Sequence, residues 1–153
     1  MQKKKVFLFT QVGLDDMKAE LADLLEKRKP AVAELSRARD MGDRSENAAY
    51  KSARQILTGL DRRIQRLEHV IKHSQVVQPK FKDIVDIGSQ VILENENGIV
   101  QYLIVGGMES DLSKGRLSCF SPVGKAVMNK KVGDRVSVHV PAGRIEYFLK
   151  EIK

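Results

Sequence analysis

Residues 14–38 read LDDMKAELADLLEKRKPAVAELSRA, and residues 53–71 read ARQILTGLDRRIQRLEHVI. Both stretches place apolar residues three and four positions apart, with charged residues at most other positions. The repeating positions are Leu14, Met17, Leu21, Leu24, Ala31, Leu35 and Ala38, then Ala53, Leu57, Leu60, Ile64, Leu67 and Ile71. A narrow apolar stripe of this kind is typical of a coiled coil. We therefore predict two helices that pack antiparallel across a short loop, with Arg28 in the one slot that breaks the first stripe.

The short segment between the two stripes should form the tip of this hairpin. Gly42 is the natural residue for chain reversal, because glycine enters left-handed conformations freely. Ser45 or Asp43 is expected to cap the second helix. A helix over residues 47–74 would be about 42 Å long, so its tip should project far from the rest of the chain. Pro30 lies inside the first pattern and predicts a bend there.

The pattern changes near residue 78 from helical spacing to short β-rich runs separated by turn signals. Strands are predicted at 90–94, 99–105, 116–119, 135–140 and 145–152, and a short helix at 122–128. Ser121 should cap that helix and Pro122 should occupy its first turn. The predicted fold class is α+β: a helical hairpin over residues 1–78, followed by a mostly antiparallel β domain with one helix over residues 79–153.

The composition favours an acidic partner. The chain carries a formal net charge of +7 and a pI near 9.6, a balance that suits nucleic acid or another polyanion, although it also serves simple solubility. One cysteine, Cys119, excludes an intramolecular disulfide and a zinc site built on several thiolates, and we expect it to be a small buried hydrophobe. No run approaches the roughly 18 apolar residues of a membrane span, so the cytoplasm is the expected location.

Carboxylates gather at the predicted tip. Asp43 and Glu46 are three residues apart and would face the same side of a helical turn, where two carboxylates can bind a divalent cation or polarise water. Ordinary helix capping explains acids at this place equally well. Magnesium prefers six oxygens, so two carboxylates alone make a poor site. A functional tip would therefore need a partner that supplies the remaining ligands.

A basic stripe follows the second predicted helix toward that tip. The stripe lies off the apolar seam and comprises Lys51, Arg54, Arg62 and Arg66. Such a face suits a nucleic-acid backbone, although many coiled coils simply carry solvated charges there. His69 and His73 lie four apart on the same helix, but no third metal ligand is evident, so we expect surface histidines.

The tip sequence ARDMGDRSENAAY, residues 38–50, resembles the signature of the bacterial Gre transcript-cleavage factors, with its Gly-Asp-x-x-Glu-Asn-Ala-x-Tyr core. The blocks at 121–127, 131–134 and 140–143 are similar to the C-terminal part of that family, in the same order. The start Phe9-Thr10-x-x-Gly13 is similar to the family's entry to its first helix. Position 49 is Ala, where family members usually carry an acid. The tip and the segment 60–64 look closer to the GreB branch.

The resemblance implies a coiled coil that enters the secondary channel of RNA polymerase and an FKBP-like domain that docks at the channel's rim. Asp43 and Glu46 would help hold a weakly bound Mg²⁺ inside the polymerase complex, with no metal bound stably by the chain alone. Polymerase would then cut the 3′ end of backtracked RNA. The resemblance assigns docking to Ser121 and Pro122. It assigns tip support to Arg39, Gly42, Ser45, Asn47 and Tyr50, and adds Arg44 to the basic stripe.

Three other functions remain open at this point. A channel inhibitor of the same fold would bind polymerase without promoting cleavage, although the intact acidic pair argues against it. A prolyl isomerase would need a pocket rich in aromatic residues, and residues 79–153 contain few. Free-standing DNA binding lacks a base-reading motif. The chain is expected to act as a monomer that is not itself an enzyme.

Overall fold

The computed structural model describes residues 6–42 and 46–153, which form two compact units. One unit is Asp15–His73. The other combines Ser74–Lys153 with the chain up to Leu14. The predicted division at residues 78 and 79 therefore does not coincide with the packing units, because the first residues of the chain pack with the β-rich part.

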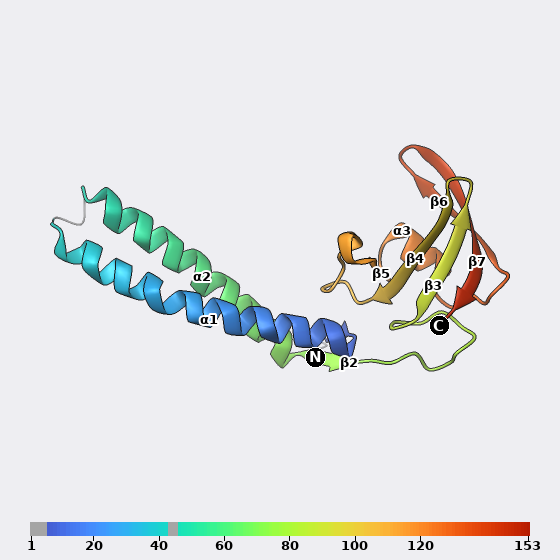
Figure 1. Cartoon of the computed structure of the whole chain (residues 1–153), viewed down its shortest axis with the longest axis horizontal. Helices are drawn as coiled ribbons and strands as arrows, with labels where there is room; N and C mark the ends of the chain where they lie inside the picture. Colours follow the sequence, from blue (N-terminus) through green and yellow to red (C-terminus); the bar gives the residue numbers. More distant parts are fainter. Residues whose placement is uncertain (1–5, 43–45) are drawn as a thin grey trace, which may run out of the picture. The chain divides into compact units, whose positions relative to one another are not determined.

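The first unit is the predicted helical hairpin (Figure 1). Helix α1 spans Gln11–Asp40 and helix α2 spans Ala48–Lys72. The stripe residues are buried or half-buried, and the best covered are Ala38, Ala53, Ile64 and Leu67. Their burial confirms the antiparallel seam, since it withdraws one apolar stripe of each helix from water.

Two ion pairs join the helices beside the seam. Arg28 occupies the predicted break in the stripe, and its Nε donates to Asp61 Oδ1 at 2.6 Å. Arg63 donates to Glu20 Oε1 at 2.6 Å. The hydrogen bond and the charge of Asp61 raise the pKa of Arg28. Both pairs are largely open to solvent, so they contribute little to stability and mainly select the helix register.

Pro30 does not interrupt the first helix, which is continuous from Gln11 to Asp40. The helix therefore continues on both sides of Pro30, and the bend expected there stays a prediction. Proline cannot donate a hydrogen bond to the carbonyl of Glu26. Both residues are exposed to solvent, so water can replace the missing partner, and burial of the seam on either side holds the helix.

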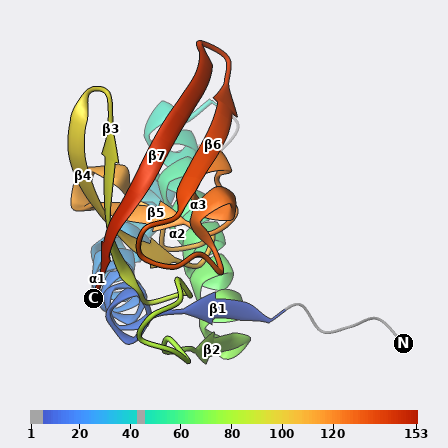
Figure 2. The same ribbon diagram turned by 90° about the vertical axis from the view of Figure 1, so that its right-hand side faces the viewer.

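The second unit contains a five-stranded sheet in the order β5-β4-β3-β7-β6. Its strands are β3 Gln90–Asn95, β4 Gly98–Val105, β5 Arg116–Ser118, β6 Arg135–Val140 and β7 Gly143–Ile152. All pairings are antiparallel except β4 with β5, and Figure 2 shows β6 and β7 as a long antiparallel ribbon. The helix α3 spans Pro122–Val127. These elements confirm the predicted fold class and most of the predicted strand positions.

Two features of this unit were not predicted. Strand β1, Phe7–Phe9, pairs in parallel with β2, Ser74–Val76, so the two chain segments that flank the hairpin lie side by side. A 3-10 helix, η1, covers Leu112–Lys114 and ends at Gly115, whose φ is 67°. Three-residue elements are too short to show a periodicity in the sequence.

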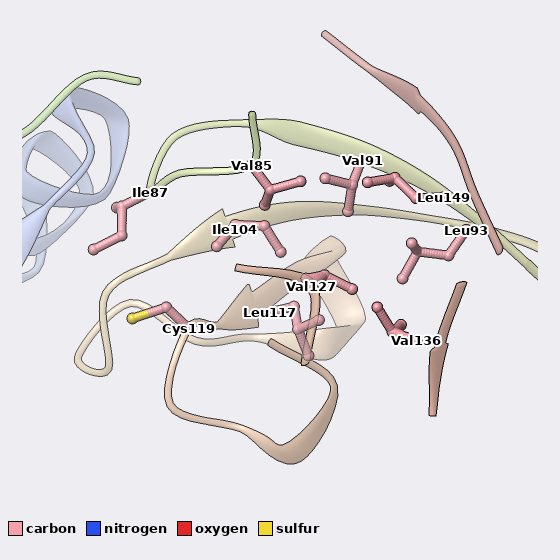
Figure 3. Close-up of a cluster of buried hydrophobic side chains, with 10 residues drawn as sticks. All are labelled: Val85, Ile87, Val91, Leu93, Ile104, Leu117, Cys119, Val127, Val136 and Leu149. Atoms are coloured by element: carbon pink, nitrogen blue, oxygen red, sulfur yellow. The ribbon is translucent and has the colours of Figure 1, made fainter. Parts of the chain in front are cut away.

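The core of the β unit lies between the sheet and α3. Figure 3 shows ten buried side chains from both, among them Val91, Leu93, Ile104, Val127 and Leu149, which are completely covered. Cys119 belongs to this cluster, which confirms its prediction as a buried hydrophobe. Within the described ranges, no helix combines the length and the apolar character needed to cross a membrane.

Two glycines in helices should respond oppositely to alanine. Gly59 in α2 has open space where a Cβ would lie, so Gly59→Ala should stabilise the hairpin by about 0.5–1 kcal/mol through the helix preference of alanine. Gly124 in α3 is the matched contrast, because its Cβ would lie 2.0 Å from the Ser118 carbonyl oxygen. Gly124→Ala should cost about 1–3 kcal/mol. Urea unfolding followed by circular dichroism measures both, and equal effects would contradict this packing.

Candidate functional site

The tip of the hairpin is formed by the end of α1 and the start of α2. Helix α1 ends at Asp40, Met41 is 76% exposed, and Gly42 has a φ of 143°, which confirms its predicted part in the chain reversal. The predicted residues Asp43, Arg44 and Ser45 lie outside the described residues. Glu46, the second acid of the predicted pair, is exposed. Its carboxylate is therefore accessible to a partner.

Asn47 links the two helix ends with one side chain. Its Oδ1 accepts the N–H of Tyr50 at 3.0 Å and so caps α2. Its Nδ2 donates to the carbonyl oxygen of Ala38 in the last turn of α1, at 2.7 Å. The predicted cap was Ser45 or Asp43, and the structure corrects it to Asn47. The carboxamide of asparagine carries an acceptor oxygen and a donor nitrogen on separate atoms, so one side chain can make both bonds at once.

The other two predicted support residues flank this link. Tyr50 is half-buried on the first turn of α2 and supplies the capped N–H. Arg39 lies in the last turn of α1, where its positive charge interacts favourably with the helix dipole, and is exposed. In the described part of the tip, the hydrogen bonds of Asn47 therefore hold the two helix ends together, and the charged side chains of Arg39 and Glu46 are exposed.

The basic stripe lies on the face of α2 opposite the seam. Lys51, Arg54 and Arg62 line one open depression together with Gln55, Thr58 and Gly59. Arg66 is exposed one turn farther on. Unlike Arg28 and Arg63, these four cations make no ion pair with a carboxylate in the described ranges. Their charge is therefore available to an anionic partner.

A second candidate surface surrounds the start of α3. Ser121 caps this helix as predicted: its Oγ accepts the Gly124 N–H at 3.0 Å and donates to the Ser118 carbonyl at 2.7 Å. Pro122 occupies the first turn and is exposed. Because the capping serine is bonded on both sides, the exposed proline is held in a rigid first turn of α3.

Sequence reasoning missed the apolar character of this second surface. Phe120 is 65% exposed and lines an apolar pocket of about 340 Å³ with Val6, Phe7, Leu8, Gly107 and Met108. An exposed ring beside an apolar hollow is typical of a protein-binding surface. The only signal in the sequence was the aromatic residue directly before the predicted docking pair.

The remaining titratable candidates show no catalytic arrangement among the described residues. Burial raises the pKa of the Cys119 thiol, which keeps it protonated and poorly nucleophilic. The rings of His69 and His73 lie 4.4 Å apart, and His73 Nδ1 is 2.8 Å from the His69 carbonyl oxygen. Within the described ranges, no three His, Cys, Asp or Glu side chains are grouped as metal ligands.

The hairpin and the β unit are each matched by a model of one protein family. The profile described as "Transcription elongation factor, N-terminal" matches residues 7–76, and "Transcription elongation factor, GreA/GreB, C-term" matches residues 78–153. The chain belongs to the GreA/GreB family of transcription elongation factors.

Full-length relatives agree with this assignment. Transcription elongation factor GreA of Amoebophilus asiaticus is 38% identical, over 97% of this chain and 98% of its own length. GreA of Acidiphilium cryptum is 39% identical over 100% and 99%, and GreA of Rhodospirillum rubrum is 42% identical over 88% of both chains. These relatives are named GreA, so the closer likeness of the tip to the GreB branch has no support.

Solved structures of similar proteins were also found. GreA factor homolog 1 of Thermus thermophilus is 22% identical over 97% of this chain and 99% of its own, with a TM-score of 0.46. A GreA/GreB elongation factor from Nitrosomonas europaea is 18% identical over 96% and 98%, with a TM-score of 0.42.

Replacement of Asn47 should separate its two bonds. Asn47→Ala removes both and should destabilise the hairpin by about 1–2 kcal/mol, as expected for loss of a helix cap. Asn47→Ser retains an acceptor for the Tyr50 N–H but cannot reach the Ala38 carbonyl, so its cost should be about half as large. Thermal unfolding at 222 nm measures this order. A serine variant as unstable as the alanine variant would assign the whole effect to the bond with Ala38.

Proposed function

We propose that this chain inserts its hairpin into the secondary channel of bacterial RNA polymerase and stimulates the polymerase's own cleavage of the 3′ end of backtracked RNA. Cleavage releases the displaced 3′ segment and lets an arrested complex resume synthesis. The chain would act as a cytoplasmic monomer and as a cofactor of the polymerase rather than as an enzyme. The observation that carries the proposal is the exposed Glu46 at the tip of a hairpin joined by Asn47, beside four cations of α2 that form no ion pair among the described residues.

The tip supplies the chemistry in this proposal. Glu46 is exposed, and Asp43, known here from the sequence, stands three residues before it. Their carboxylates suit Mg²⁺, which prefers oxygen ligands, but two carboxylates leave most of its coordination sites for other groups. The polymerase would supply those groups. Magnesium held there would polarise a water and neutralise charge on the phosphodiester.

The basic stripe supports an encounter with RNA rather than with a protein surface. Its four cations lie along one face of α2, and their spacing follows the helix toward the tip. Phosphates that contact such a face release counterions, so binding weakens as salt rises. The threading RNA 3′ segment is the polyanion that the proposed channel offers. A longer backtracked segment would contact more of the stripe.

The β unit would hold the polymerase at the channel rim. Ser121 and Pro122, with the neighbouring Phe120 and its apolar pocket, provide an uncharged, rigid surface for a protein partner. Docking raises the effective concentration of the tip near the active centre without adding a contact there. A channel inhibitor of the same fold would dock in the same way, and the exposed Glu46 favours stimulation over that alternative.

Removal of the tip charges should abolish stimulated cleavage. Asp43→Asn or Glu46→Gln should reduce the cleavage rate by about a hundredfold or more while polymerase binding persists, because docking uses another surface. Glu68→Gln is a matched control, since it removes one exposed carboxylate near the far end of α2. The measurement is the release of short 3′ RNA from a stalled, backtracked complex with Mg²⁺. Normal cleavage by both tip variants would refute the proposed chemistry.

Alanine at Lys51, Arg54, Arg62 and Arg66 together should impair cleavage of extended backtracked RNA more than of one- or two-nucleotide backtracks. Fewer counterions are released when the stripe is neutral, so the salt dependence should also become shallower. The matched control neutralises four cations of α1: Lys18, Lys27, Lys29 and Arg37. Cleavage is measured across backtrack lengths at two salt concentrations. A uniform loss at every length would argue for a role in docking or folding instead.

A further inference from the structure

Glu109 is a buried carboxylate that the proposed cleavage does not use. It is only 7% exposed and follows β4 in the loop before η1. Its Oε1 accepts the N–H of Thr10 at 2.7 Å and the N–H of Gly106 at 3.3 Å, and its Oε2 accepts the hydroxyl of Thr10 at 2.7 Å. The carboxylate therefore accepts hydrogen bonds from both donors of Thr10, its backbone N–H and its hydroxyl.

Thr10 is at the start of α1. Its hydroxyl oxygen accepts the Gly13 N–H at 3.1 Å, and its carbonyl oxygen accepts the Leu14 N–H at 3.1 Å. These two bonds make Thr10 the cap of the helix. The negative charge of Glu109 thus lies at the positive end of the helix dipole, where it is stabilised.

Two glycines allow this close approach. A Cβ on Gly13 would lie 1.6 Å from Glu109 Oε2, and a Cβ on Gly106 would lie 1.9 Å from the Leu8 carbonyl oxygen. A side chain at Gly13 would displace the Glu109 carboxylate, and one at Gly106 would collide with the backbone of β1. The contact between Glu109 and Thr10 therefore depends on glycine at both positions.

Backbone pairing and apolar burial also hold the segment around Thr10 in place. Strand β1 pairs with β2, and the Val77 N–H donates to the Phe9 carbonyl oxygen at 2.8 Å. Phe9 is completely covered and Leu14 is buried. The side chain of Glu109 joins this strand pair to the five-stranded sheet. We call these contacts of Glu109 with Thr10 the clasp.

We propose that Glu109 is a positioning residue whose clasp on Thr10 fixes the direction in which α1 leaves the β unit. This inference rests on the proposed function, in which one unit docks and the other acts. Helix α1 continues without interruption from Gln11 to Asp40, so a constraint on its first turn acts on the rod that carries the tip. A loose first turn would spread the positions of the tip over a wide arc.

A purely structural role predicts a different result. If the clasp only stabilises the β unit, its loss lowers the melting temperature, and cleavage at a temperature well below melting stays normal. If it positions the helix, folded protein docks normally but cleaves poorly even at saturation. The cost of a misplaced reacting group is about a hundredfold for an error near 1 Å. Docking and positioning are therefore separable in the full chain.

The variants are Thr10→Val and Glu109→Gln, with Thr10→Ser as the matched control. Valine has the shape of threonine but no hydroxyl, serine retains both donors, and glutamine keeps the side-chain length while one of its two terminal atoms no longer accepts a hydrogen bond. Glu109→Gln leaves the cap of α1 in place, so it reports on the clasp if Thr10→Val folds poorly. Pro122→Glu serves as a docking-defective comparison.

The direct measurement is the distance distribution between spin labels at Ser36 on α1 and His139 on β6, in a Cys119→Ala background. Both label sites are exposed. Thr10→Val and Glu109→Gln should broaden the distribution at a temperature where circular dichroism shows folded protein, and Thr10→Ser should match the parent. An unchanged distribution in Glu109→Gln would overturn the proposal. This measurement needs no polymerase, so it decides the clasp independently of the proposed function.

The functional measurement is cleavage at rising factor concentration, with competition binding to polymerase. The two clasp variants should bind within about twofold of the parent but reach a plateau rate about tenfold or more lower. Pro122→Glu should need more protein and approach the parent plateau. A normal plateau with a broadened distribution would overturn the positioning role. A parent chain that binds but never cleaves would refute the proposed function instead.

Discussion

Burial of one apolar stripe from each helix is the constraint on which the hairpin depends. The helices have 30 and 25 residues, and both are too polar elsewhere to form a globular core. Their mutual burial offsets the entropy of ordering two long rods. One seam position is not apolar. Arg28 occupies it, and its charge is tolerated because it pairs with Asp61 on the other helix.

The fold was largely predictable where a local pattern extended over several residues. The seam followed from its spacing, and the turns around Gly98 and Gly143 bounded strands that the structure reproduces closely. The pairing of β1 with β2 escaped prediction because it joins short segments far apart in sequence. Pro30 lies on the solvent face of α1, where the helix tolerates it.

The candidate site was predictable in residue type but less so in geometry. An acidic tip and a basic face can be recognised from charge and spacing alone. The cap of α2 could not be predicted, because Asp, Ser and Asn are all good capping residues and the sequence does not show that Asn47 also reaches the Ala38 carbonyl. Phe120 and Glu109 break the usual rules of burial, one exposed and aromatic, the other covered and charged. An exposed aromatic residue or a buried carboxylate cannot be recognised from the pattern of a single sequence.

The parallel pairing of β1 and β2 makes the hairpin an insertion into the β unit rather than a domain placed before it. The chain enters the insertion after Phe9 and returns at Ser74, beside its point of departure. Both ends of the rod thus share one fixed base. Evolution or design can lengthen, shorten or exchange the rod, keeping whole turns matched in both helices, without altering the sheet. The length of the hairpin can therefore vary while the β unit stays the same.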